Sequence, residues 1–191
     1  IANRIKERID RLGQTVADPF FMSYLNLYIE KQFPAEELRK MLTLVESYMF
    51  RRIICGEQSN ALRNMFASLH RRVLRLEANT EYSYSSVLTY LLENIQTVFP
   101  DNTKFANSFG EKDIYHLRSN IRSYILDRLE RKDNAETINV FERLEGVNRQ
   151  PNEKPFSVEH VMPQTLSEAW ITELGGDPIV AAEIHKNWVH K

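Results

Sequence analysis

Two neighbouring side chains, Glu159 and His160, combine a carboxylate with an imidazole. They lie in the segment Phe156–Met162, which alternates apolar and polar residues and is followed by Pro163 and Gln164. A carboxylate is a hard oxygen ligand for Mg²⁺. An unperturbed imidazole, with a pKa of about 6.5, can take a proton from water near neutral pH. This pair of groups suits metal-assisted hydrolysis of a phosphodiester.

The alternation over Phe156–Met162 predicts the one short β-strand of the chain. In a strand, Glu159 and His160 point to opposite faces, so a turn at Pro163 must bring both toward one ion and its water. An acid followed by a histidine is also common by chance. A histidine that only makes hydrogen bonds within a strand therefore stands as the alternative.

The segment resembles the opening strand of HNH (ββα-metal) nucleases, which has the form acid-His-hydrophobic-hydrophobic-Pro. More narrowly, it resembles the C-terminal HNH domain of GmrSD-type modification-dependent restriction enzymes. The residues that carry the narrower resemblance are 156–166, Trp170, His185, Val189-His190, the RRIICG helix end within 48–56, 99–101 and 124–130.

This resemblance implies that Glu159 binds Mg²⁺ (or Mn²⁺) and that His160 is the general base for the attacking water. It gives Pro163, Gln164 and His190 supporting roles, with Pro163 shaping the turn. The implied protein is a restriction endonuclease of a prokaryotic cytoplasm that cleaves or nicks DNA, in particular modified DNA, in defence against phage. An N-terminal sensor domain of the same protein is the implied partner.

The family's second strand, with its asparagine, and its final helix find no position before Lys191. We therefore expect the family domain to span about 46–191 and to continue beyond the chain, which begins at Ile1 and looks like a fragment. A half-complete site predicts that this fragment alone is inactive and holds no metal. It also predicts an unpartnered strand edge, with the residues from 148 onward packed less well than the helices.

A basic stretch is a second candidate for contact with DNA. Residues 46–76 carry six arginines and two glutamates, a local net charge of +4 in a chain whose total is −1. Neutralised phosphates release counterions, so these side chains can bind a DNA backbone. The alternative is a solvated face, or arginines bound to carbonyls near a helix end. The candidate DNA contacts are Arg51, Arg52, Arg71, Arg72 and Arg75.

The remaining histidines and the single cysteine are not predicted to bind a metal or to act in catalysis. His185 and His190 are five residues apart, a spacing that does not place them on one helical face, so a zinc site is not predicted there. The single cysteine, Cys55, is expected to be a small buried apolar residue, and it excludes an internal disulfide. A reducing cytoplasm is the simplest compartment for such a chain.

The elements that must position these residues are predicted to be mainly α-helical. Six glycines among 191 residues favour helices, and apolar residues recur at spacings of three and four. We expect a helical bundle over 1–146 and a partial HNH module with one short strand over 147–191. The predicted helices cover 1–12, 19–33, 34–55, 59–76, 85–99, 111–132, 167–174 and 178–189, with a short turn capped by Asp101 around Phe105.

No apolar run approaches the roughly 18 residues of a membrane span, and no signal peptide is visible. The rival functions are non-catalytic. One is a helical interaction module that couples a sensor domain to a partner, and the other is a DNA-binding scaffold based on the arginines alone.

Overall fold

The structure, a computed structural model, describes residues 2–13, 15–31, 33–76, 82–133 and 157–190. These residues are mainly helical, which confirms the predicted fold class at that level, and no strand occurs among them. They form two compact units, Ile1–Phe109 and Gly110–Lys191. The boundary predicted at 146/147 lies outside the described residues. None of the helices in the described ranges is both long enough and apolar enough to cross a membrane.

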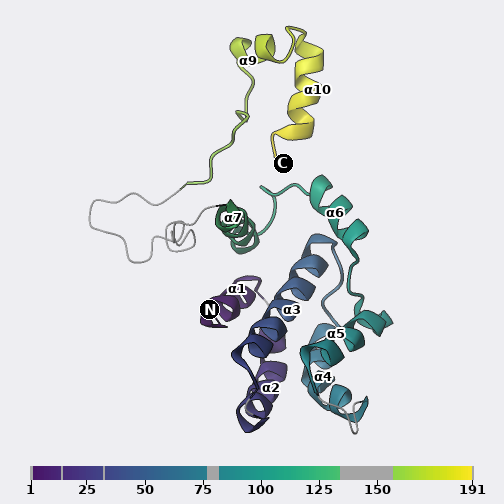
Figure 1. Cartoon of the computed structure of the whole chain (residues 1–191). Coiled ribbons are helices and arrows are strands. Elements are labelled where there is room, and N and C mark those ends of the chain that lie inside the picture. Colours follow the sequence, from purple (N-terminus) through teal and green to yellow (C-terminus); the bar gives the residue numbers. More distant parts are fainter. Residues whose placement is uncertain (1, 14, 32, 77–81, 134–156, 191) are drawn as a thin grey trace, which may run out of the picture. The chain divides into compact units, whose positions relative to one another are not determined.

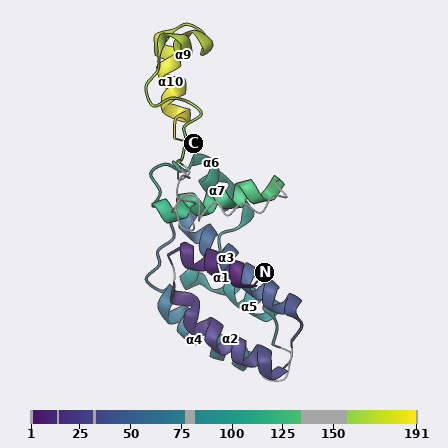
Figure 2. The same ribbon diagram turned by 90° about the vertical axis from the view of Figure 1, so that its left-hand side faces the viewer.

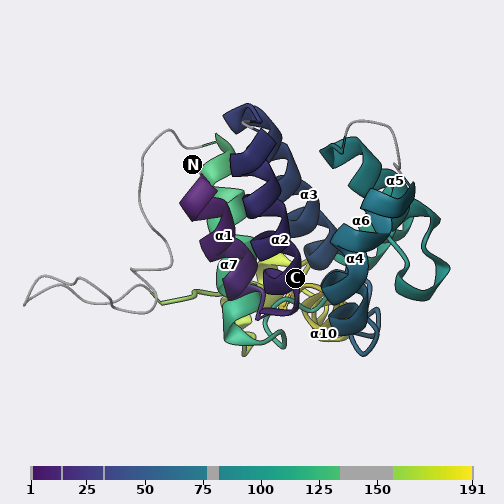
Figure 3. The ribbon, with the colours of Figure 1, turned by 90° about the horizontal axis from the view of Figure 1, so that it is seen from below.

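The first unit is built from helices that pack in pairs. Helix α1 packs on α3, α2 packs on α4, and α5 contacts both α3 and α4 (Figures 1 and 3). The elements are α1 (Ala2–Arg11), η1 (Thr15–Ala17), α2 (Asp18–Lys31), α3 (Ala35–Ile54), α4 (Leu62–Leu76), α5 (Tyr84–Glu93), η2 (Ile95–Thr97) and α6 (Asn102–Glu111), which contains the boundary with the second unit.

Aromatic side chains form the centre of the first unit. Phe66 of α4 packs against Phe20 of α2 and edge-on against Tyr48 of α3, with ring centroids 6.2 and 6.1 Å apart. Tyr48 also stacks on Phe99 at 5.2 Å, and its hydroxyl donates to the Thr97 carbonyl over 2.8 Å. Because the Tyr48 ring is buried, it ties the segment after η2 to the helices by both apolar contact and a hydrogen bond.

The helix ends follow the sequence signals closely. Gly13 and Gly56 adopt left-handed backbone conformations with φ of 71° and 69°, as residues that follow a helix often do. Asp101 accepts a hydrogen bond from the Lys104 amide over 2.7 Å at the start of α6. The capped turn predicted around Phe105 is therefore a full helix.

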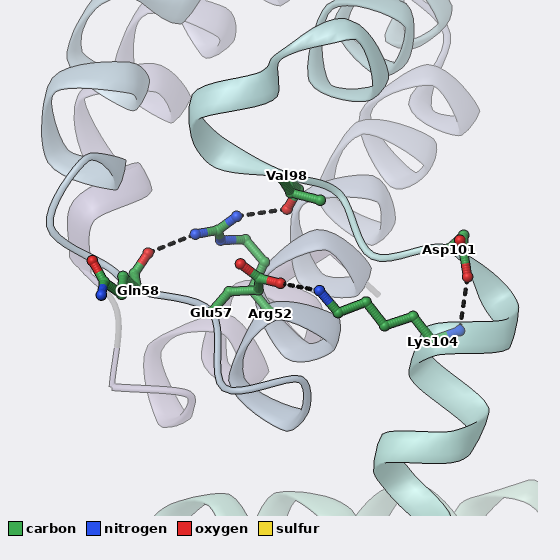
Figure 4. A network of polar contacts seen from close by, with 6 residues as sticks. All are labelled: Arg52, Glu57, Gln58, Val98, Asp101 and Lys104. Atoms are coloured by element: carbon green, nitrogen blue, oxygen red, sulfur yellow. Dashed lines mark hydrogen bonds and ion pairs between the residues drawn. The ribbon is translucent and has the colours of Figure 1, made fainter.

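Arg52 connects the end of α3 to two loops (Figure 4). Its guanidinium donates to the carbonyl of Val98 over 2.5 Å and to the carbonyl of Gln58 over 2.6 Å. The residue is only 3% exposed, so its side chain is enclosed by the protein. Nearby, Lys104 pairs with Glu57 at 2.5 Å. Through Arg52, the loop before α4 and the segment after η2 are both bound to the end of α3.

Two predicted helices are shorter than expected. The helix predicted over 85–99 ends at Glu93, because the Asn94 side chain accepts from the amides of Gln96 and Thr97 and starts η2 instead. The helix predicted over 111–132 begins only at Ser119. Residues 112–118 form turns and irregular chain in its place.

The second unit contains α7 (Ser119–Asp133), α9 (Glu168–Glu173) and α10 (Pro178–Trp188). Helices α9 and α10 pack against each other (Figure 2). The link between them passes through Gly175 and Gly176, which have φ of 107° and 80°, and Asp177 then caps α10. Both helices were predicted, with ends that agree to within one residue.

The strand predicted over 156–162 is not seen in the described part of that segment. Residues 157–162 have no strand pairing, and Phe156 lies outside the described residues. A strand exists only through hydrogen bonds to a neighbouring strand. Here the Glu159 carbonyl accepts from a tyrosine hydroxyl instead, that of Tyr115.

Candidate active site

A pocket of about 300 Å³ lies in the second unit, around His160. Its walls come from the turn before α7, from α7 itself, from the 158–164 segment and from the second residue after α10. The lining residues are Tyr115, His116, Arg122, Val158, His160, Gln164 and His190.

The ring of His160 is held by Tyr115. The two rings stack at a centroid distance of 3.8 Å and an interplanar angle of 17°. The Tyr115 hydroxyl donates to the carbonyl of Glu159 over 2.8 Å, and Arg122 Nη1 donates to the carbonyl of Tyr115 over 2.8 Å. Contacts on the ring face and on the adjacent backbone together restrict the orientation of the imidazole.

The turn after His160 is held by two polar contacts. The Gln164 amide nitrogen lies 3.4 Å from His160 Nε2, where it can donate to that atom. The Nε2 of His185, on α10, donates to the carbonyl of Pro163 over 2.7 Å. His185 therefore anchors the turn at Pro163.

His190 lies between two other imidazoles. Its ring is 5.8 Å from that of His160 and 5.0 Å from that of His116, edge-on in both cases. The Ile114 amide donates to the His190 carbonyl over 3.1 Å, which joins the residue to the turn before α7. Its Nδ1 is buried and makes no hydrogen bond to any residue that the structure describes.

Asp113 and His116 form a pair at the start of this turn. The Asp113 carboxylate accepts from the His116 amide over 3.2 Å, and its other oxygen lies 2.6 Å from His116 Nδ1. Partial desolvation raises the pKa of Asp113, but the hydrogen bonds from His116 and the charges of His116 and His190 outweigh it and lower that pKa below its ordinary value. Asp113 is therefore a carboxylate at neutral pH.

The carboxylate of Glu159 is not part of the pocket wall. It is exposed and accepts from the Ser157 hydroxyl over 2.6 Å. The structure thus brings His160, Gln164 and His190 together, while Glu159 contributes its backbone carbonyl and Pro163 its carbonyl in the adjoining turn. The metal-binding role predicted for Glu159 stays a prediction.

Sequence reasoning missed the side of the pocket that the turn before α7 contributes. Asp113, Tyr115 and His116 were placed in a continuous helix, and Arg122 was given no role. A signal was present in the spacing of Asp113 and His116, because an aspartate that accepts from a nearby backbone amide competes with helix formation.

The five candidate DNA-contacting arginines separate into two groups. Arg51 donates to the Pro100 carbonyl and to the Asn102 side chain, and Arg52 binds the two carbonyls described above. On α4, Arg72 donates to the Tyr90 hydroxyl. Arg71 and Arg75 are exposed and lie one turn apart on the same helix. The predicted contact with DNA remains untested for all five.

A family model matches part of the chain. Residues 99–191 match the family described as GmrSD restriction endonucleases, C-terminal domain. This range includes every residue that lines the pocket. Neither the curated proteins nor the solved structures contain a match to the chain. The likeness to GmrSD restriction endonucleases that the motifs indicated is therefore supported over the second half of the chain, and its extension to residues 48–98 rests on the motif there alone.

Proposed function

We propose that the chain, whose residues 99–191 are similar to the C-terminal domain of GmrSD restriction endonucleases, forms part of an enzyme that hydrolyses DNA phosphodiesters at the pocket around His160. One observation carries this proposal. Three imidazoles and a guanidinium, from segments far apart in the sequence, converge on a single pocket within the matched residues.

His160 acts as the general base in the proposed reaction. A water oxygen attacks the phosphorus atom, its proton passes to His160 Nε2, and the bond from phosphorus to the leaving sugar oxygen breaks. Water displaces the Gln164 amide from Nε2 when the substrate enters, a small change because that contact is long at 3.4 Å. Tyr115 keeps the imidazole ring in place by stacking.

Arg122 binds the phosphate group in this proposal. The guanidinium of Arg122 is charged at all physiological pH values, and it reaches the pocket while anchored to the Tyr115 carbonyl. Positive groups fixed beside a phosphate stabilise the negative charge that develops in the transition state. His116 and His190 line the same pocket.

Family resemblance assigns the metal ion, Mg²⁺ or Mn²⁺, to Glu159, where it would act as a Lewis acid on the phosphate. The described residues around Glu159 do not fit that role. Its carboxylate is bound to Ser157 and belongs to no cluster of three ligand side chains in the described part of the chain. Mg²⁺ held by one carboxylate keeps most of its water and binds weakly.

The finer features of an HNH nuclease belong to the same proposal. Residues 156–162 would become the opening strand of the ββα module when a second strand pairs with them, because an isolated edge has no partner for its backbone groups. Modified DNA as substrate, defence against phage and a prokaryotic cytoplasm follow from the resemblance to the family.

The proposed function is tested by cleavage of DNA with the full-length protein that contains this chain. Supercoiled plasmid, prepared with and without base modification, is incubated with Mg²⁺ or Mn²⁺, and nicked and linear products are separated on a gel. We expect metal-dependent conversion that EDTA stops. Binding of DNA without conversion of either plasmid would instead support the DNA-binding scaffold, for which the exposed arginines of α4 argue.

Replacing Arg71 and Arg75 together by glutamine is expected to weaken DNA binding without stopping cleavage at saturating protein. Each phosphate contact makes the slope of log K against log salt steeper by about 0.9. The slope of the double variant should therefore be shallower than that of the wild type by about 2. Fluorescence anisotropy at several salt concentrations measures it.

The matched control for the α4 arginines is Arg39→Gln. Arg39 is also exposed on a helix of the first unit, but it pairs with Glu36. The salt dependence of DNA binding by Arg39→Gln should have the same slope as that of the wild type. An unchanged slope in the double variant would remove Arg71 and Arg75 from the DNA interface.

A further inference from the structure

We propose that Asp113, His116 and His190 bind a divalent transition-metal ion next to His160. One ligand atom from each of the three residues lies within 4.8 Å of the other two. The site joins a turn and the second residue after α10, which are more than 70 residues apart in the sequence. Metal binding here stands on its own, and only its use in catalysis rests on the proposed nuclease function.

The backbone already holds the two halves of this site together. The Ile114 amide donates to the His190 carbonyl over 3.1 Å, and the Leu117 amide closes the turn by donating to the Ile114 carbonyl over 3.2 Å. Val189, just before His190, is buried and fixes the end of α10. The ligands are therefore preorganised by hydrogen bonds that do not use their side chains.

His190 Nδ1 supplies the observation that points to a ligand. This nitrogen is buried, and no residue of the described ranges makes a hydrogen bond to it. Buried polar atoms in folded proteins are nearly always paired, because an unpaired one loses the hydrogen bonds that water would provide. A metal ion bound at this nitrogen would satisfy it.

Asp113 and His116 are suited to complete the site. Each offers an atom of a type that binds transition metals, a carboxylate oxygen in one case and an imidazole nitrogen in the other. Asp113 Oδ2 and His116 Nδ1 are 2.6 Å apart. Ligands of a tetrahedral ion with bonds of about 2.0 Å lie roughly 3.3 Å apart, so the pair must open by less than about 1 Å.

The set of donors selects the kind of ion. Two imidazoles and one carboxylate suit Zn²⁺, Mn²⁺ or Co²⁺, whereas Mg²⁺ and Ca²⁺ prefer oxygen ligands. Three protein ligands leave coordination positions open for water or a phosphate oxygen. The His160 ring, 5.8 Å from that of His190, borders the same pocket. This assignment differs from both sequence-based expectations, a metal ligand at Glu159 and a fragment that holds no metal.

The test is a calorimetric titration of Zn²⁺ into the purified 191-residue chain. We expect one saturable site. Asp113→Asn should weaken binding by about 10- to 100-fold or more, while its amide oxygen can still accept from the His116 amide and preserve the turn. Glu159→Gln, which removes the other candidate carboxylate, should bind Zn²⁺ within about threefold of wild type, less than the smallest effect expected of a metal-site group.

Circular dichroism and thermal unfolding without metal show that each variant is folded, and His190→Ala provides a second loss of ligand. The absence of a saturable site in the wild type, or loss of binding in Glu159→Gln with binding kept in Asp113→Asn, would overturn the assignment. Because DNA is absent from the titration, the nuclease function is judged separately. Zn²⁺ binding without plasmid cleavage would support the metal site and contradict the nuclease function. Plasmid cleavage without Zn²⁺ binding would support the nuclease function and contradict the metal site.

Discussion

His160→Ala in the full-length protein is expected to slow DNA cleavage by a factor of about 10² to 10⁴, while leaving DNA affinity nearly unchanged. A general base acts on the proton of the attacking water, so its loss raises the barrier of the chemical step and barely alters binding of the substrate. Cleavage of end-labelled DNA under single-turnover conditions measures that step directly, and anisotropy measures affinity. A rate within about threefold of wild type would remove His160 from the mechanism.

Val161→Ala is the matched control for His160. Val161 is the next residue and is 97% exposed, so the change perturbs the same segment of backbone without touching the pocket wall. It should cleave at the wild-type rate. Thermal unfolding of both variants separates catalysis from folding, because His160→Ala also removes the stacking contact with Tyr115, a contact of about 1 kcal/mol.

Arg52→Met is expected to lower the free energy of unfolding by about 2 to 4 kcal/mol. Methionine fills much of the same volume but leaves the carbonyls of Val98 and Gln58 without the donor that the buried Arg52 side chain provides (Figure 4). The guanidinium also lies 5.5 Å from the centroid of the Tyr48 ring, and that attraction is lost too. Urea unfolding followed by circular dichroism gives the difference.

Arg51→Met is the comparison for Arg52. Arg51 has the same chemistry, but its side chain is partly exposed, and one of its two partners, the Asn102 side chain, is exposed, so water can replace that bond. We expect a loss of about 1 kcal/mol or less. Equal losses for the two variants would show that the carbonyls near Arg52 find other partners, and would contradict its structural role.

The helices of the first unit were predictable because local signals and packing agree there. Residues at helix ends, such as Gly13, Gly56 and Asp101, specify local backbone conformations or caps. The turn over 112–118 was not predictable in this way. Its apolar residues continue the spacing of α7 and therefore predict helix. The hydrogen bonds that hold the turn instead go to the carbonyls of distant residues, Glu159 and His190.

The site was predicted only in part, for the same reason. The motif located His160, Gln164 and His190, since a short motif carries its own geometry. Tyr115, Asp113 and His116 reach the pocket through tertiary contacts that no single segment encodes. The motif gave no sign that the carboxylate of Glu159 would bind Ser157. The same holds for Arg52, whose carbonyl partners are fixed only in the folded unit.

The hydrogen bond from the Ile114 amide to the His190 carbonyl has a consequence for synthesis of the protein on the ribosome. One wall of the pocket, residues 115–122, is translated at least 68 residues before His190. A nascent chain therefore cannot close the pocket until His190 has left the exit tunnel. Under the proposed function, DNA cleavage by unfinished chains is prevented by the order of translation.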